Sequence, residues 1–278
     1  MSIFLQSFNR GVQGNPQTLF KMPGGEWHIK SETPWAGDQW ALVRWGNGDE
    51  LMALAIWADA VHRDGGTPRV VIPYLPGARQ DRRKVGEALS SKIYADMINS
   101  CELALVVCLD PHSDVMPALL NNCRVIDSAS LVVEALRHQA PDDAYAGIIA
   151  PDAGAYKRAE RVATEMKLPL FQATKVRDSA SGRLSDFKCE GLPEDKILVV
   201  VDDICDGGRT FVGLARATGI PKGRLFLWVT HGVFSAGSRA LVDYYSAIMT
   251  TDSHEGTQVN DAEERWWITK VFPRLTRI

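Results

Sequence analysis

The chain has 278 residues and a net charge of only −3 at pH 7, so it is long enough for two domains that each bury a core. The near-neutral charge, without a basic run or arm, argues against a nucleic-acid-binding protein. Because no stretch of about 18 apolar residues occurs and the N-terminus does not resemble a secretory signal, we expect neither a membrane span nor export.

Short aliphatic segments alternate with longer amphipathic segments along the chain. Predicted strands cover residues 41–45, 69–74, 103–109, 146–150, 168–173, 197–201, 224–230 and 246–250. Predicted helices cover residues 49–63, 85–99, 129–138, 154–166, 209–217 and 236–244. This order predicts an α/β protein with mainly parallel sheets flanked by helices. A polar segment with a proline at residues 138–144 divides it into an N-terminal domain, residues 1–140, and a C-terminal domain, residues 141–278.

The cysteines indicate neither a disulfide framework nor a zinc site. Their number is odd, they are scattered, and no two have the Cys-x-x-Cys spacing. They are Cys101, Cys108, Cys123, Cys189 and Cys205. A reducing, cytoplasmic location fits this pattern best.

A cationic cluster follows the predicted strand 69–74. Four cations lie within residues 79–84, and Gln80 and Asp81 lie among them. Arginine side chains at the carboxyl end of a strand suit the oxygens of a polyphosphate. A solvated basic turn is the structural alternative.

Two weaker signals also follow predicted strands. His112 stands between Asp110 and Asp114, where it could bind a divalent metal, steer a phosphate or have a structural role only. Asp152 precedes a predicted helix and is either a helix cap or a ligand.

Lys175 and Arg177, followed by small polar residues, suggest a flap that carries positive charge. Such a flap could close over a transferring phosphoryl group and exclude water. An exposed linker would have a similar sequence.

The most informative stretch is residues 197–210, in which a strand, a loop and a helix follow one another. The loop holds Asp202, Asp203 and Asp206, then Gly207 and Gly208, before Arg209 and Thr210. Glycines and a helix N-terminus suit a phosphate, while carboxylates suit sugar hydroxyls or a hydrated Mg²⁺. The loop therefore predicts a phosphorylated sugar as ligand, with an ordinary strand-to-helix turn as the alternative.

Seven blocks, in this order, resemble the signature blocks of the ribose-phosphate diphosphokinase family, also called the phosphoribosyl pyrophosphate synthetases. They are Gly24-Gly25-Glu26, Ala78 to Arg82, Asp110-Pro111-His112, Pro151 to Gly154, Lys175-Val176-Arg177, Asp202 to Thr210 and Thr230 to Ser235. The resemblance implies two tandem phosphoribosyltransferase-type domains, the first on the ATP side and the second with the sugar-phosphate loop and the flap. It also implies transfer of the β,γ-diphosphoryl group of MgATP to the C1 hydroxyl of ribose 5-phosphate, which gives phosphoribosyl pyrophosphate and AMP.

The resemblance implies a role for each block. ATP would bind to Glu26, Arg79, Gln80, Asp81, Arg82 and His112, and Mg²⁺ to His112, Asp152, Asp202 and Asp203. The catalytic residues would be Lys175 and Arg177. The sugar phosphate would bind to Asp202, Asp203, Asp206, Gly207, Gly208, Arg209 and Thr210. In the family a neighbouring subunit completes the adenine site through the block that matches Met22 to Glu26, so a homo-oligomer is implied.

The chain departs from the family pattern at the sugar-phosphate loop. Arg209 stands where the family usually has glycine, so an acceptor with a substituted 5-phosphate, such as ADP-ribose, is an alternative to ribose 5-phosphate. The adenine block also differs at Met22 and Gly24, and the chain is shorter than typical members, so we do not extend the hexamer or the allosteric control of the family to it. Two further alternatives are a type I phosphoribosyltransferase and an inactive regulatory subunit. The Arg79–Arg82 block argues against the first, and the presence of Lys175 and Asp202 argues against the second.

Overall fold

The computed structural model describes residues 3–7, 17–44, 48–177, 184–235, 239–260 and 266–275. The chain forms two compact units, the first ending at Ile126 and the second running from Asp127 to Val271, with α8 (Phe272–Leu275) grouped with the first. The boundary therefore lies after Ile126 and not after residue 140. The physical reason is that α4 (Ala129–Gln139) packs against α5 (Tyr156–Met166) of the second unit.

The first unit contains a five-stranded sheet in the order β1-β4-β5-β6-β7. Its strands are β1 (Ile3–Ser7), β4 (Asp38–Val43), β5 (Thr67–Val71), β6 (Leu105–Leu109) and β7 (Cys123–Ile126). β1 is antiparallel to β4, and the other neighbours are parallel. The sequence predicts β4, β5 and β6 but neither of the two edge strands.

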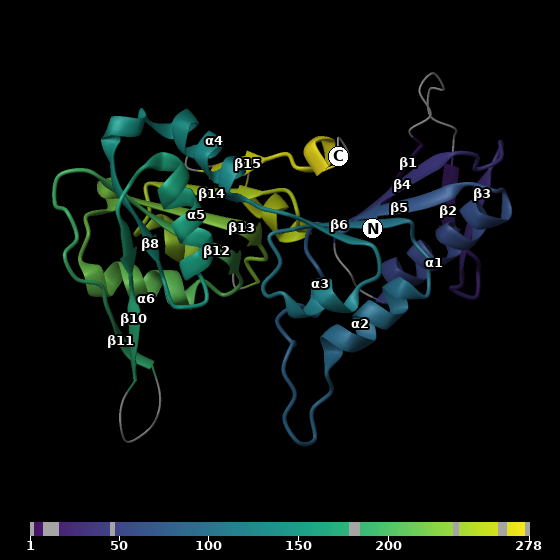
Figure 1. Ribbon diagram of the computed structural model, residues 1–278, viewed down its shortest axis with the longest axis horizontal. Coiled ribbons are helices and arrows are strands. Elements are labelled where there is room, and N and C mark those ends of the chain that lie inside the picture. The colour runs from purple at the N-terminus through teal and green to yellow at the C-terminus, as the bar shows by residue number, and fades with distance from the viewer. Residues whose placement is uncertain are drawn as a thin grey trace. The chain divides into compact units, whose positions relative to one another are not determined.

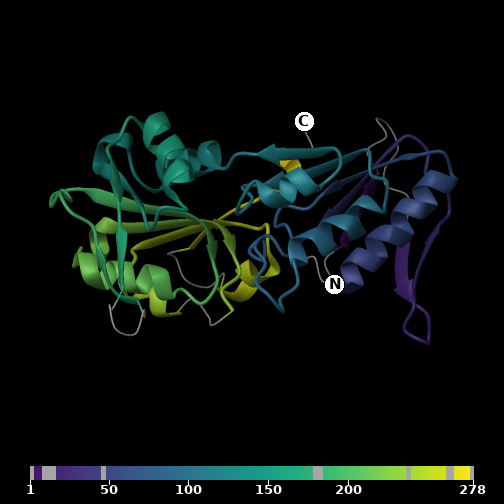
Figure 2. The ribbon, with the colours of Figure 1, turned by 60° about the horizontal axis from the view of Figure 1, so that its bottom comes forward.

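Three helices lie side by side along one face of this sheet (Figure 2). They are α1 (Gly48–Arg63), α2 (Ser90–Asn99) and α3 (Val115–Leu119). Trp57 of α1, Ile98 of α2 and Met116 of α3 share one buried apolar cluster with the sheet. The prediction that α2 begins at residue 85 is wrong, because Gly86 has a φ of 84°, which no α-helix accommodates.

A two-stranded hairpin, β2 (Gln17–Lys21) and β3 (Trp27–Ser31), packs against α1. Trp27 and Ile29 are buried, whereas His28 and Lys30 are exposed. This alternation is that of a strand with one buried face. The sequence analysis assigns no element to this segment.

The second unit contains a six-stranded sheet, in the order β15-β14-β13-β12-β8-β9, in which all neighbours are parallel. Its strands are β8 (Tyr145–Ala150), β9 (Leu170–Gln172), β12 (Ile197–Cys205), β13 (Leu225–Gly232), β14 (Ala247–Thr251) and β15 (Trp266–Thr269). Three 3-10 turns, Asp142–Ala144, Lys222–Arg224 and Glu255–Asn260, connect them. The central strands β12 and β13 carry the residues that matter most for the candidate site.

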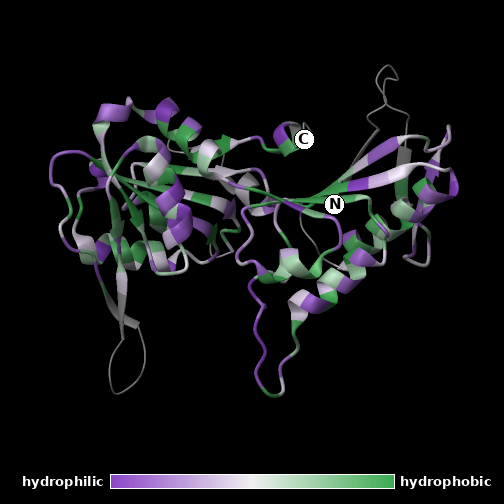
Figure 3. Ribbon diagram, in the orientation of Figure 1, coloured by the Kyte–Doolittle hydropathy of each residue, from purple (hydrophilic) through white to green (hydrophobic). Residues whose placement is uncertain are grey.

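Helices cover both faces of this sheet (Figure 1). Leu198 and Val200 of β12 pack in one cluster with α6 (Arg209–Thr218) and α7 (Arg239–Val242), while α5 contacts β8 and β12. Val199 and Val201, which alternate with them, are fully buried too. The predicted mainly parallel α/β architecture is confirmed, and Figure 3 shows these central strands as the apolar part of the unit.

A second hairpin, β10 (Thr174–Arg177) and β11 (Leu184–Lys188), projects from the second unit (Figure 1). The predicted strand 168–173 is shorter in the structure, where β9 covers Leu170–Gln172, and β10 begins after it at Thr174. No helix in the part of the chain that the structure describes is long and apolar enough to cross a bilayer.

Candidate active site

The two adjacent acids Asp202 and Asp203 lie within β12, near its carboxyl end. The sequence predicts that the strand ends at residue 201, but it continues to Cys205 because β13 still pairs with it there, Asp202 opposite Val229 and Cys205 opposite Gly232. Both carboxylates are therefore held by a central strand, and their side chains are only 14% and 7% exposed. We expected them in a loop, and the structure places them on a more rigid element.

Arg158 on α5 forms ion pairs with both acids. Its Nη1 lies 3.6 Å from Oδ1 of Asp202, and its Nη2 lies 3.7 Å from Oδ2 of Asp203. The arginine side chain is 11% exposed. Arg158 is not among the residues predicted from the sequence, although a cation next to Ala159 on the buried face of a predicted helix is a usable signal.

Burial and neighbouring charges shift the pKa values of Asp202 and Cys205. Burial, reinforced by the neighbouring Asp203 carboxylate, raises the pKa of Asp202 well above its ordinary value, and Arg158 opposes that rise. Burial also raises the pKa of Cys205 to about 12. The Cys205 thiol therefore stays protonated at neutral pH and is no candidate nucleophile.

The loop after β12 leads directly into α6. Gly208 is the N-cap, with a φ of 73° that favours glycine, and Arg209 is the first helical residue and is exposed. The first turn of a helix leaves backbone N–H groups without intrahelical acceptors, and its dipole favours an anion. The predicted phosphate loop thus has the local geometry that anion binding requires.

The segment at the carboxyl end of β13, the neighbouring strand, is hydrogen-bonded to this loop. The backbone N–H groups of Val233 and Phe234 both donate to the Cys205 carbonyl, and Ser235 Oγ donates to the Asp206 carboxylate. The predicted blocks at residues 202–210 and 230–235 are therefore brought together. The parallel register puts their carboxyl ends at one edge of the sheet.

Two buried histidines lie behind the loop. His231 Nδ1 lies 2.8 Å from Ser253 Oγ, and that hydroxyl donates to the Thr230 carbonyl. His254 Nδ1 accepts the Gly256 N–H at 2.9 Å. Burial lowers the pKa of His254 to about 4, with His231 acting in the same direction and Asp206 against it. His254 is therefore neutral at physiological pH.

Asp152 follows β8, the other parallel neighbour of β12. Its Oδ1 accepts the backbone N–H groups of Gly154 at 3.0 Å and Ala155 at 3.2 Å. These bonds form an Asx-type turn just before α5, whose N-cap residue is Ala155 and which has no side-chain cap hydrogen bond. Of the two roles that the sequence leaves open, the helix cap is therefore not the one seen, and the metal-binding role of Asp152 stays a prediction.

The backbones of Lys175 and Arg177 lie in the projecting hairpin, where Lys175 pairs with Phe187 and Arg177 with Leu184. The predicted flap therefore begins as a strand. Its remaining residues, 178–183, lie outside the described part of the chain, as do the side chains of these two cations. Their catalytic role stays a prediction.

In the first unit, a long polar loop between β5 and α2 carries Arg79, Gln80, Asp81 and Arg82 (Figure 3). Ser113 Oγ donates to Asp81 Oδ2 at 2.7 Å, so this loop is tied to the segment after β6 that holds His112. The preceding Asp110 is buried and has a φ of 42°, unusual for a residue with a side chain. The two predicted ATP-binding blocks thus lie together.

The Glu26 block forms the turn of the β2–β3 hairpin. Met22 N–H donates to the Glu26 carbonyl at 2.7 Å, and Gly25 has a φ of 98°. The Glu26 carboxylate lies over Gly24, in the space that a side chain there would occupy. Glu26 itself is exposed.

The donor set at the end of β12 suits Mg²⁺. Asp202 and Asp203 place carboxyl oxygens side by side at the end of the strand, and Mg²⁺ prefers oxygen ligands and retains several waters. Among the described residues no group of three or more His, Cys, Asp or Glu side chains forms a complete metal cage. Any Mg²⁺ there would accordingly share its coordination with water or substrate.

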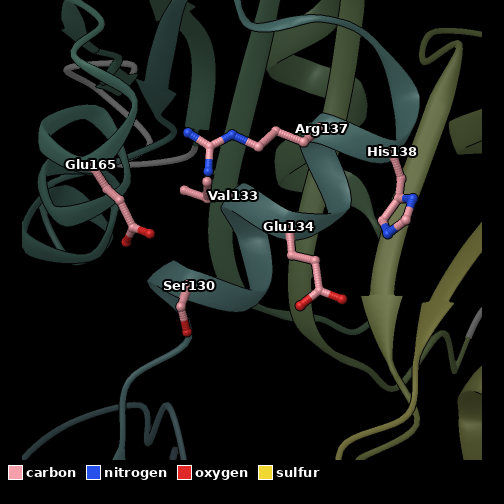
Figure 4. Close-up of a pocket in the computed structure, with 6 residues that line it drawn as sticks. All are labelled: Ser130, Val133, Glu134, Arg137, His138 and Glu165. Carbon is pink, nitrogen blue, oxygen red and sulfur yellow. The ribbon is translucent and has the colours of Figure 1, made fainter.

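A surface cleft of about 240 Å³ lies between α4 and α5 (Figure 4). Its lining residues are Ser130, Val133, Glu134, Arg137, His138 and Glu165. None of them is a predicted site residue. The strand ends, and not this cleft, therefore define the candidate site.

Comparisons with known proteins match both halves of the chain to protein families. Residues 125–219 match the phosphoribosyl transferase domain family, and residues 11–101 match the N-terminal domain of ribose phosphate pyrophosphokinase. A phosphoribosylpyrophosphate synthetase structure from Mycobacterium smegmatis superimposes with a TM-score of 0.77 over 95% of this chain and 89% of that chain. At 20% sequence identity, this match shows a shared fold.

Similar sequences occur in several organisms. A ribose-phosphate pyrophosphokinase of Granulibacter bethesdensis is 31% identical over 221 residues, which cover 76% of this chain and 69% of that protein. One of Cereibacter sphaeroides is 31% identical, covering 74% and 63%, and ribose-phosphate pyrophosphokinase A of Dictyostelium discoideum is 30% identical, covering 67% and 59%. The chain thus spans about three-fifths of the length of these last two relatives.

Proposed function

Because the chain belongs to the ribose-phosphate pyrophosphokinase family, we propose that it transfers the β,γ-diphosphoryl group of ATP to the C1 hydroxyl of ribose 5-phosphate and releases AMP. The observation that carries the proposal is the end of β12, where two buried acids precede a glycine loop and the N-terminus of α6. Acids beside an anion-binding helix end suit a ligand with both hydroxyl groups and a phosphate.

The chemistry asks the protein mainly to position both substrates and to stabilise negative charge. Asp202 and Asp203 orient the ribose hydroxyls, and the loop from Asp206 to Thr210 holds the 5-phosphate. In the first unit, Arg79, Gln80 and Arg82 bind the nucleotide, with Glu26, Asp81 and His112 beside them. Mg²⁺, when bound, offsets the charge of the triphosphate.

Lys175 and Arg177 complete the proposal. The C1 oxygen attacks the β-phosphorus while the bond to the α-phosphate oxygen breaks, so charge spreads over the transferring group. Cations on a projecting hairpin can approach that group when both substrates are bound and keep water away from it. The homo-oligomer and the cytoplasmic location expected from the sequence stay predictions.

A second acceptor is favoured by one observation, the exposed Arg209 at the first position of α6. A guanidinium there adds a cation to a helix end that already favours an anion. A 5-phosphate with a further phosphoryl substituent, as in ADP-ribose, uses that extra charge and would give ADP-ribose pyrophosphate.

The test is to incubate the purified protein with MgATP and either ribose 5-phosphate or ADP-ribose, and to resolve the products by mass. We expect AMP and an acceptor heavier by one diphosphoryl group, with ribose 5-phosphate as the better acceptor. Preference for ADP-ribose would establish the second candidate. AMP with neither acceptor would refute both, and a third reaction with phosphoribosyl pyrophosphate and a nucleobase tests for phosphoribosyltransferase activity.

A further inference from the structure

Arg158 contacts the side chains of both Asp202 and Asp203, which are consecutive residues of β12. Successive residues of a strand point to opposite faces of the sheet, so Asp202 and Asp203 start in different directions. The Asp202 carboxylate nevertheless lies close to the Asp203 backbone, because its Oδ1 accepts the backbone N–H of Asp203 at 2.9 Å. Arg158 Nη1 lies near that same oxygen, and Nη2 lies near the other acid. One planar guanidinium thus spans both carboxylates.

Arg158 lies within ion-pair range of both carboxylates, at nitrogen–oxygen distances of 3.6 Å to Asp202 and 3.7 Å to Asp203. Because the acid side chains are only 14% and 7% exposed, water screens the guanidinium charge little, and that charge acts on both acids.

The helix that carries Arg158 is anchored by packing. Asp152 accepts the N–H groups of the turn just before α5, and Ala159 and Val162 are fully buried on one side of the helix. Arg158 lies next to this buried side, and α5 contacts β12 directly. Its guanidinium is consequently placed by packing and not by a mobile loop.

We propose that Arg158 is a positioning residue of the acceptor site, which holds the carboxylates of Asp202 and Asp203 side by side in the arrangement that receives the ribose hydroxyls. This proposal rests on the assignment of these two acids to the acceptor. A guanidinium keeps its charge at every physiological pH, so the arrangement exists before any ligand arrives. A lysine at this position would supply a single point charge that cannot span both acids.

The experiment compares Arg158→Gln, Arg158→Lys and a matched control, Arg161→Gln. Arg161 lies one turn later on the same helix, is 61% exposed and pairs with Asp127. For Arg158→Gln we expect the Kd of ribose 5-phosphate alone, measured by titration calorimetry, and the acceptor KM to rise at least tenfold. The KM of ATP should stay within twofold. Arg158→Lys should recover part of the loss, and Arg161→Gln should behave as the wild type.

A second measurement does not depend on catalysis. Removal of Arg158 leaves two buried acids without this partner, so Arg158→Gln should lower the Tm, and adding Asp202→Asn should restore part of it. If Arg158→Gln fails to fold, Arg158→Lys, which keeps the charge, carries the binding test.

The outcomes separate this proposal from the proposed reaction. Unchanged acceptor binding in a folded Arg158→Gln variant, or additive Tm shifts in the double variant, would overturn the role of Arg158. A wild type that forms no AMP would refute the diphosphoryl transfer, while a non-additive Tm shift would still support the positioning of the acids by Arg158.

Discussion

Gly208, at the start of α6, provides the sharpest test of the phosphate loop. Its φ is 73°, and a Cβ added there would lie 3.4 Å from Leu241 Cδ2, an ordinary van der Waals contact. Gly208→Ala would therefore introduce conformational strain without a clash. The left-handed conformation costs a residue with a side chain about 1–2 kcal/mol.

The other end of the same helix supplies a matched control. Gly219 is the C-cap of α6, has a φ of 62°, and has no atom within 4 Å of an added Cβ. Gly219→Ala should lose the same roughly 1–2 kcal/mol. In a protein of this size, each kcal/mol lowers the Tm by about 2–4 °C.

The two variants should differ in function and not in stability. We expect Gly208→Ala to raise the acceptor KM about 10- to 100-fold, because a displaced loop misplaces the bound phosphate, while Gly219→Ala keeps the wild-type KM. The assays are thermal unfolding and initial rates with the acceptor varied at saturating ATP. Equal acceptor KM values in the two variants would refute the assignment of this loop to the acceptor. A stable Gly208→Ala beside a destabilised Gly219→Ala would refute the strain argument.

Three further predictions concern other parts of the site. Ser113→Ala removes the 2.7 Å hydrogen bond to Asp81, so the KM of ATP should rise several-fold in initial-rate measurements while the acceptor KM stays constant. Because folding lowers the pKa of His254 from 6.5 to about 4, the unfolded chain binds more protons between these values. His254 alone should then remove roughly 3 kcal/mol from the unfolding free energy as pH falls from 6.5 to 4. His254→Asn should lose less in urea titrations across this range, and an equal loss would contradict the assignment. Lys175→Ala should lower kcat about 10²- to 10³-fold with the Kd of ATP unchanged, and parallel losses in both would remove Lys175 from the transition state.

The central strands were predictable because each begins with a buried apolar run. Residues Leu198 to Val201 of β12 and Leu225 to Val229 of β13 are buried on both faces, and such runs stand out without any knowledge of their neighbours. The edge strand β7 was not predictable, since two of its four residues are exposed and no apolar run marks it. The start of α2 was misplaced because the backbone conformation of Gly86, which breaks the helix, is not visible in an amphipathic pattern.

In the candidate site, too, some features could be predicted from the sequence and others could not. The glycines and acids of residues 202–210 could be predicted because their chemistry is local to one segment. The contacts Arg158–Asp202 and Ser113–Asp81 join segments far apart in the sequence. They become evident only when the packing of α5 on β12, and of one loop on another, is known.

The exposure of Arg209 also bears on how this family diversifies. An exposed residue at the first position of a helix can be exchanged within about ±0.5 kcal/mol of stability, whereas the acids on β12, Asp202 and Asp203, cannot, because their side chains are largely buried. If Arg209 contacts the acceptor as proposed, a single substitution there would change acceptor preference without disturbing the strand that carries Asp202 and Asp203. Substrate choice and fold stability would then depend on different residues.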